Sequence, residues 1–257
     1  AYTAQWVQLY TVTFKVEGGS GGKLKGEYNG ESKEASGTTR QEFANIPAGE
    51  TITFSATASA DYAVHSWTGV TASLPDSATA TLTVTGNATV TVKFYETTLD
   101  VNSHTTEAWK KLKERIAAAP SGGTLKISGT IKATTAPGNS GEIIIDKDLT
   151  IQGKNGAGTD ILDANESAFT DEKVKHRIFH VKDGKTLTLK NLTLKNGAVG
   201  NGVVGSLGTT GGGIRIENGT VLLSDVIISG CKAITAGRYN AQGKYEGFHG
   251  NGAGIYV

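Results

Sequence analysis

The stretch LTLKNLTL at residues 187–194 returns without gaps as VLLSDVII at residues 221–228, 34 positions further along the chain. In each copy, two three-residue runs that are apolar at their first and third positions flank a polar pair that contains Asn191 or Asp225. Alternation with a period of two is typical of a strand, and the polar pair predicts a turn at which Asn191 lies over Asp225. A repeat this short cannot close a core of its own, so we expect its copies to stack as coils of a solenoid.

Further short strands of the same form extend this pattern in both directions. We expect them at 124–127 and 130–131, 142–145 and 149–153, 178–181 and 187–189, 213–216 and 221–223, and 254–257. The remaining residues of each round form insertions at corresponding corners, at about 155–177, 196–212 and 230–253. The pattern predicts rows of Val, Ile and Leu that run along the axis of the solenoid.

One helix is predicted before the first of these strands. Ser103 or Thr105 is the expected N-cap, basic residues follow toward the C-terminus, and the segment 120–123 (PSGG) ends the helix. Apolar residues recur every three or four positions on one face. These residues are Ala108, Trp109, Leu112, Ile116 and Ala119. We expect the helix to cover one end of the solenoid.

Residues 98–257 resemble the right-handed parallel β-helix of the pectin-lyase-like superfamily. Three motifs, GGGI at 211–214, NGT at 218–220 and GAGIYV at 252–257, are especially similar to polymorphic outer-membrane proteins and autotransporter passengers. The resemblance implies a surface-exposed and often adhesive protein. The chain stops inside a strand at Val257, so we expect further coils in the parent protein, and dimerisation of this fragment through the open end is an expected artefact.

The first 97 residues have a different pattern, with short alternating strands and glycine turns. Four of these strands read YTVTF at 10–14, GETITFSA at 49–56, YAVHSW at 62–67 and ATVTVKF at 88–94. They resemble the bacterial repeat domain related to the divergent internalin-type B-repeat, which implies a stalk or an adhesive spacer without catalytic residues. We expect residues 1–7 to be the last strand of a preceding copy and residues 8–97 to be the next copy. The predicted class for the whole chain is all-β, with this small repeat domain before a capped, truncated β-helix.

Composition excludes several classes of function. The 257 residues include 35 glycines, 4 prolines, a single cysteine and no methionine, and the net charge is +1. No basic stripe or recognition motif predicts nucleic acid binding, and Cys231 has no partner for a disulfide. The missing initiator methionine predicts a processed or cloned fragment of a longer protein, and the two resemblances imply an extracellular or cell-surface location.

The best candidate binding segment is the last insertion. It concentrates aromatic and cationic residues on a loop, where binding residues tend to lie. The candidate binding residues are Arg238, Tyr239, Lys244, Tyr245, Phe248 and His249. The alternative is a loop that packs its own aromatic rings against the flank of the solenoid. The expected partner is a host or matrix protein or a glycan.

No catalytic residue and no metal ligand is predicted. The scattered histidines, with His176 in a loop and His180 pointing outward between Phe179 and Val181, give no transition-metal spacing. The acidic candidates for a calcium site are Asp146, Asp148, Asp160, Asp163, Asp171 and Asp225. Turns account for these residues, so no cofactor is expected, although calcium stays open without a specific motif.

Three functional hypotheses follow from these features. The first is an adhesin or binding scaffold, in which a repeat stalk presents the β-helix. The second is a polysaccharide lyase or glycoside hydrolase whose active site lies largely in missing coils, which predicts an acidic, calcium-binding groove. The third is a spacer, which predicts that the loop 230–253 can be shortened without phenotype.

Overall fold

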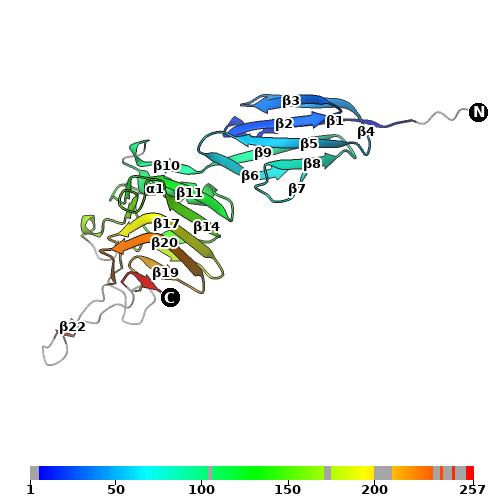
Figure 1. Cartoon of the computed structure of the whole chain (residues 1–257). Coiled ribbons are helices and arrows are strands. Elements are labelled where there is room, and N and C mark those ends of the chain that lie inside the picture. The colour runs from blue at the N-terminus through cyan, green and yellow to red at the C-terminus, as the bar shows by residue number, and fades with distance from the viewer. Residues whose placement is uncertain are drawn as a thin grey trace, which may run out of the picture. The chain divides into compact units, whose positions relative to one another are not determined.

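The computed structural model describes residues 6–103, 106–170, 175–199, 210–233, 238–239, 245–246 and 253–257. The chain divides into two compact units, Ala1–Thr97 and Thr98–Val257 (Figure 1). The described residues are mostly strands and include one α-helix, so the predicted all-β class is confirmed. Among the described residues, no helix is both long enough and apolar enough to cross a membrane.

The first unit contains two sheets. Strands β4 (Arg40–Pro47), β1 (Leu9–Val16), β9 (Ala88–Glu96) and β6 (Tyr62–Thr68) form one sheet in that order. The other has the order β3 (Glu31–Ser36), β2 (Gly22–Tyr28), β5 (Thr51–Ala58), β8 (Thr79–Thr83) and β7 (Thr71–Ala72). All pairs are antiparallel except β1 with β9. Residues 1–5, which include most of the predicted preceding strand, lie outside the described residues, and residues 6–8 precede β1.

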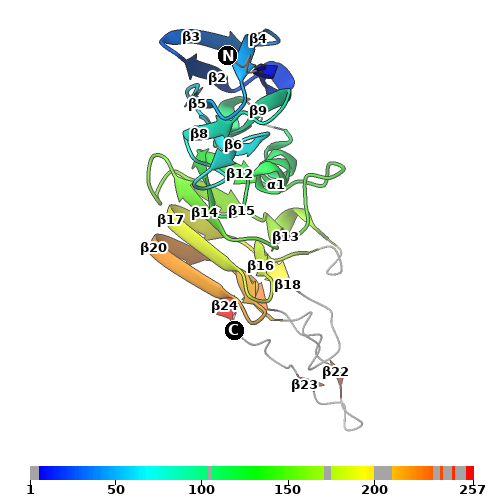
Figure 2. The ribbon, with the colours of Figure 1, turned by 90° about the vertical axis from the view of Figure 1, so that its right-hand side faces the viewer.

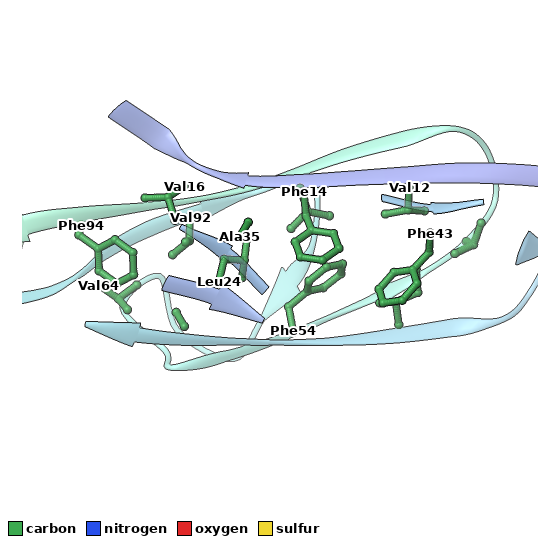
Figure 3. Close-up of a cluster of buried hydrophobic side chains, with 14 of the residues drawn as sticks. Val12, Phe14, Val16, Leu24, Ala35, Phe43, Phe54, Val64, Val92 and Phe94 are labelled. Atoms are coloured by element: carbon green, nitrogen blue, oxygen red, sulfur yellow. The ribbon is translucent and has the colours of Figure 1, made fainter. Parts of the chain in front are cut away.

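The core of the first unit lies between these sheets and follows from the alternation in the sequence. Phe14 and Phe54 are fully buried, and their rings meet edge to face at 5.4 Å (Figure 3). Phe43 stacks on Phe14 at 5.6 Å. Gly26 lies against this cluster, where a Cβ atom would come within 2.9 Å of the Phe14 ring. The glycine in β2 therefore makes room for the aromatic core.

The second unit is a solenoid with three parallel rows of strands. One row consists of β10 (Thr98–Asp100), β11 (Gly123–Ser128), β14 (Leu149–Gly153), β17 (Thr186–Lys195) and β20 (Thr220–Ser229). The second row joins β12 (Thr130–Lys132) and β15 (Ile161–Asp163) to the C-terminal part of β17. The third row consists of β13 (Ile143–Ile145), β16 (Phe179–Val181), β19 (Ile214–Ile216) and β24 (Ile255–Tyr256) (Figure 2).

The predicted alignment of 187–194 with 221–228 is confirmed residue by residue. Leu187 pairs with Val221, and Leu194 pairs with Ile228. At the predicted turn β17 and β20 each continue as one strand, but the pairing of β17 changes there, from β14 up to Lys190 to β15 from Thr193. Asn191 and Asp225 instead have left-handed backbones, with φ of 52° and 53°, which short polar side chains tolerate. Each strand therefore bends at one residue without breaking.

The predicted insertions also contain strands that were not expected. The segment 155–177 includes β15 and the 3-10 turn Glu166–Ala168, and 196–212 includes β18 (Ala198–Val199). Strand β18 pairs in parallel with β21 (Lys232–Ala233) of the segment 230–253. These strands were missed because each has only two or three residues, too few to show a period.

The helix α1 (Ala108–Ala118) buries the face that the sequence predicts. Four of the five predicted residues are buried within the helix, and Ala119 is buried at its C-cap. The predicted cap is wrong: Glu107 is the N-cap and makes no capping bond with its side chain. Asn139, which follows the first coil, accepts the Lys110 N–H at 2.9 Å instead. At the other end, Lys147 Nζ donates to the carbonyls of Ala117 and Ala119.

Successive coils approach each other closely at two glycines. A Cβ atom on Gly197 would lie 2.1 Å from the carbonyl oxygen of Gly212, and one on Gly213 would lie 2.4 Å from that of Gly254. In β20, Leu223 pairs with the buried Leu189, whereas Leu222 and Ile227 pair with Thr188 and Thr193, and all three side chains are about half exposed.

Candidate functional site

The predicted binding loop contains a small hairpin. Strand β22 (Arg238–Tyr239) pairs with β23 (Tyr245–Glu246), with Arg238 in register with Glu246 and Tyr239 with Tyr245 along the backbone. This pair is antiparallel, whereas every other strand pair described in the second unit is parallel. Three of the predicted binding residues, Lys244, Phe248 and His249, lie outside the described residues.

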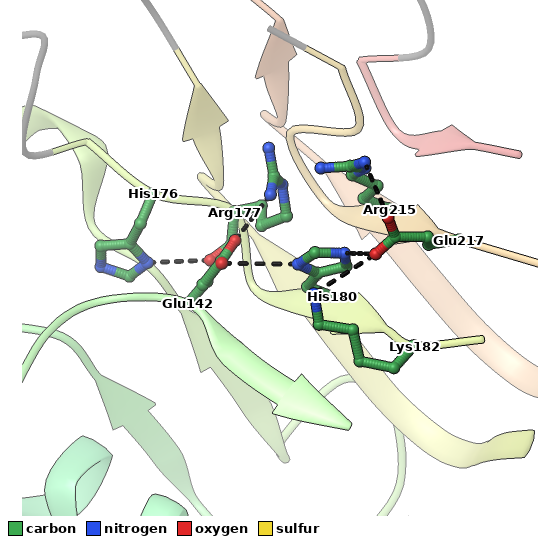
Figure 4. A network of polar contacts seen from close by, with 7 residues as sticks. All are labelled: Glu142, His176, Arg177, His180, Lys182, Arg215 and Glu217. Carbon is green, nitrogen blue, oxygen red and sulfur yellow. Dashed lines mark hydrogen bonds and ion pairs between the residues drawn. The ribbon is translucent and has the colours of Figure 1, made fainter. Parts of the chain in front are cut away.

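A second polar site lies on the outward side of β16, and the sequence did not predict it. His180 was expected to face outward, but only 5 % of it is exposed. Its Nδ1 lies 3.5 Å from Glu142 Oε1 and its Nε2 lies 2.9 Å from Glu217 Oε2 (Figure 4). The imidazole is therefore held between two carboxylates that come from different coils.

Basic side chains complete this polar network. Arg177 Nη1 donates to Glu142 Oε2 at 2.6 Å, and Lys182 Nζ lies 3.3 Å from Glu217 Oε2 (Figure 4). Arg215 Nη2 lies 3.6 Å from the other oxygen of Glu217. Hydrogen bonds from Lys182 and then from His180 lower the pKa of the Glu217 carboxyl. The network combines two carboxylates, an imidazole and three cations, which are the groups used for proton transfer and for binding charged ligands.

The network is next to an open groove between α1 and β13. The groove has a volume of about 320 Å³, and Glu142 is one of its lining residues. Lys113, Ile116 and Ala117 line it from α1, while Ile144 lines it from β13. One carboxylate of the network is thus accessible from a hollow with both charged and aliphatic walls.

His176 lies beside the network in an aromatic setting. Its ring is 5.3 Å from Trp109 and 5.7 Å from Phe169, and its Nδ1 lies 2.8 Å from the carbonyl oxygen of Arg177. Its Nε2 is buried and has no hydrogen-bond partner among the residues that the structure describes. Burial lowers the pKa of this imidazole, the nearby charge of Lys113 lowers it further, and Arg177 O and Glu142 act in the opposite direction.

We expect this histidine to make the second unit less stable in acid. Because the folded pKa lies below the unfolded value of about 6.5, the contribution of His176 to stability is fully present above pH 6.5. It is lost as the pH falls toward the folded pKa, since only the unfolded chain then binds the proton. Thermal unfolding at pH 8 and pH 5 measures the loss, which should shrink in a His176→Phe variant. An equal loss in both proteins would contradict this role.

The aspartates considered for calcium are mostly engaged in structural bonds. Asp148 accepts the Thr186 N–H, and Asp163 accepts the Asn165 N–H and the side-chain amide of Asn196. Asp160 is fully buried at a corner of the coil and accepts bonds from Gly129, Asn155 and Gly156. Asp225 accepts a bond from Ser224, and Asp171 lies outside the described residues. No group of three or more metal-binding side chains is found among the described residues.

Comparisons with known proteins give no relative for this chain. No protein-family model, no curated protein and no solved structure matches it.

Proposed function

We propose that this chain is part of an extracellular, surface-exposed bacterial protein that acts as an adhesin or binding scaffold. In this proposal the repeat-like first unit is a stalk, and the β-helix presents a binding loop to a host or matrix protein or to a glycan. The resemblances of residues 1–97 and of residues 98–257 to families of surface proteins both support a location at the cell surface. The proposal assigns no catalysis and no cofactor to the chain.

The observation that carries the proposal is the hairpin β22–β23. A solenoid needs only parallel strands to continue its rows, and this antiparallel pair belongs to none of them. It lies in the segment between β21 and β24, which also contains the predicted Arg238, Tyr239 and Tyr245. Tyrosine and arginine are the residues most enriched at the energetic centres of interfaces. An insertion of this composition fits a binding loop better than a connection between coils.

The proposal predicts that the hairpin tyrosines are needed for binding. We expect the chain to bind at least one component of an array of host matrix proteins and glycans. A Tyr239→Ala/Tyr245→Ala variant should lose affinity at least tenfold, or about 1.4 kcal/mol, because two aromatic anchors are removed. A matched Trp6→Ala/Leu74→Ala variant, which removes two exposed apolar side chains of the first unit, should bind like the parent. Unchanged affinity in the tyrosine variant would exclude the hairpin as the site.

One observation supports a second candidate, a polysaccharide lyase or glycoside hydrolase. Glu142 and Glu217 lie on either side of His180, and Glu142 lines an open groove. Paired carboxylates are the catalytic groups of most glycosidases. The unmodified chain can therefore also be tested for the release of reducing ends from acidic polysaccharides. Turnover that a Glu142→Gln variant loses would favour the enzyme over the adhesin.

A further inference from the structure

Several asparagines of this chain precede a glycine, and they differ in how firmly the fold holds them. Those within the described residues are Asn29, Asn155, Asn196 and Asn218. Asn201 and Asn251 also precede glycine but lie outside the described residues. An asparagine before glycine is chemically reactive, because the glycine nitrogen has no neighbouring side chain that would block its attack on the asparagine amide.

Asn29 and Gly30 are the two residues of the turn between β2 and β3. Tyr28 pairs with Glu31, so the connection between the strands contains these two residues alone. Both have positive φ, 47° and 79°, as a two-residue hairpin of the type I′ form requires, and asparagine followed by glycine is the sequence that best adopts it. The turn itself therefore demands the reactive pair at this place.

The reacting groups of this turn are exposed and unengaged. Asn29 and Gly30 line an open hollow of about 320 Å³ together with Tyr28, Ser32 and Thr51. Within the described part of the chain, neither the side-chain amide of Asn29 nor the N–H of Gly30 makes a hydrogen bond. A Cβ atom at Gly30 would have nothing within 4 Å. The Asn29 side chain therefore has room to rotate onto the Gly30 nitrogen, and water reaches both groups.

Two of the other asparagines are held by buried carboxylates. Asn155 Nδ2 donates to Asp160 Oδ1 at 3.1 Å. The Gly156 N–H, whose nitrogen would have to attack, donates to Asp160 Oδ2 at 3.1 Å. Asn196 Nδ2 donates to Asp163 Oδ1 at 3.0 Å. Reaction at either asparagine thus requires that bonds within the folded coil break first.

Close packing restricts the glycines on the C-terminal side of the solenoid in the same way. Gly197 is buried, and a Cβ atom there would lie 2.1 Å from the carbonyl oxygen of Gly212. The carbonyl of Asn218 accepts the Gly184 N–H at 2.9 Å, and a Cβ atom on Gly219 would come within 2.9 Å of a backbone oxygen. Ring closure moves the backbone on both sides of the reacting bond, so these contacts oppose it.

We propose that Asn29 is a site of deamidation, at which the chain converts its own asparagine to aspartate or isoaspartate. The nitrogen of Gly30 attacks Cγ of Asn29, and the bond from Cγ to the side-chain nitrogen breaks. That nitrogen leaves as ammonia with the proton that Gly30 gives up. Water then opens the resulting cyclic imide. Opening at the side-chain carbonyl gives aspartate, and opening at the main-chain carbonyl gives isoaspartate, which lengthens the backbone by one carbon atom.

The conversion acts on the hairpin of β2 and β3. Either product adds a negative charge to a hollow that Glu27 and Glu31 already line. Isoaspartate also lengthens a turn whose two residues set the register of the strands. Because β3 lies at the edge of its sheet and buries only Ala35, we expect it to separate from β2, while β2 stays paired with β5. The inference needs no ligand and is independent of the proposed function.

The test is incubation of the full chain at pH 8 and 37 °C, followed over time by peptide mapping with mass spectrometry. We expect Asn29 to convert at least about tenfold faster than Asn155 and Asn196, which react only after local opening. The readouts are the mass gain from amide to acid and labelling by isoaspartate methyltransferase. The same incubation in urea is the control, since unfolding gives all these asparagines similar freedom and should make their rates similar.

A pair of glycine variants tests the attacking nitrogen. Gly30→Ala should slow the conversion of Asn29 at least about tenfold, because the added Cβ atom hinders the nitrogen. Gly49→Ala is the matched control, since Gly49 is also exposed, has a positive φ of 90° and has nothing within 4 Å of its Cβ position. It should leave the rate at Asn29 unchanged.

The outcomes decide between the fold and the sequence as the cause. Conversion of Asn29 no faster than that of Asn155 and Asn196 overturns the inference. A difference that persists in urea also overturns it, because neighbouring residues would then set the rates. After conversion, hydrogen exchange should be faster in β3 and unchanged in β5, and unchanged exchange in β3 would contradict the effect on the hairpin.

Discussion

A Trp109→Ala variant is expected to lose about 3–5 kcal/mol of the free energy of unfolding of the second unit, as large truncations in a core do. Trp109 is fully buried on the inner face of α1, and its Nε1 donates to the carbonyl oxygen of Gly141 at 2.8 Å. Its ring also contacts His176 at 5.3 Å. The substitution thus leaves a large cavity and an unsatisfied carbonyl at the place where the helix covers the first coil.

The loss is expected to start at the helix end of the solenoid. Each coil is stabilised by its neighbours, so weakening the cover exposes β10 and β12, which contact α1, before β11 and β14. Urea denaturation followed by circular dichroism measures the free energy, and hydrogen exchange read by mass spectrometry separates β11 and β14 from the first unit. Trp6→Ala is the matched control, because Trp6 is 97 % exposed and its removal should change stability by less than about 0.5 kcal/mol. Equal stability of the two variants would exclude a capping role for α1.

Much of the solenoid could be predicted because stacking makes its sequence repeat. Residues 187–194 and 221–228 occupy equivalent positions in adjacent coils, so both must supply apolar side chains at the same places. The helix could be predicted for a similar reason, since one buried face requires apolar residues every three or four positions. Patterns of this kind are local, and a single sequence shows them.

Other structural features cannot be recognised from a local pattern in the sequence. Strand β3 reads ESKEAS and buries only Ala35, so its sequence resembles a polar loop. It forms because β2 offers a pairing edge and because ion pairs such as Lys23–Glu34 cross the two strands. The cap of α1 was missed for another reason. Asn139, which supplies it, lies 29 residues after Lys110, and nothing in the local sequence links the two.

The polar network around His180 could not be predicted because its parts come from separate coils. Glu142 precedes β13, His180 lies in β16 and Glu217 follows β19. Only the register of these strands brings the three side chains together. One signal was present, since Glu142 and Glu217 flank apolar triplets that stack on the triplet of His180. This signal can be used only when the strands of successive coils are known to pair in register, and that register is a property of the fold.

The corner between β14 and β15 depends on one buried carboxylate. Asp160 Oδ1 accepts the Gly129 N–H at 2.8 Å and the Asn155 side-chain amide at 3.1 Å. Its Oδ2 accepts the N–H groups of Asn155 and Gly156. Gly129 belongs to the preceding coil, so this side chain joins two coils through backbone groups that have no strand partner there. A carboxylate is suited to this position because it only accepts hydrogen bonds and does so at both oxygens.

An Asp160→Ala variant is therefore expected to lose about 3 kcal/mol, because three partly buried backbone N–H groups, those of Gly129, Asn155 and Gly156, lose their acceptor at about 1 kcal/mol each. Asp160→Asn keeps one acceptor oxygen but turns an amide toward N–H donors, so it should fall between alanine and the parent. Asp183→Ala is the matched control, an exposed aspartate in the turn between β16 and β17, with an expected change below about 0.5 kcal/mol. Urea denaturation of the three variants measures the order. If Asp160→Ala were as stable as Asp183→Ala, the corner would be held by strand pairing alone, and the carboxylate would be free for another role such as binding a cation.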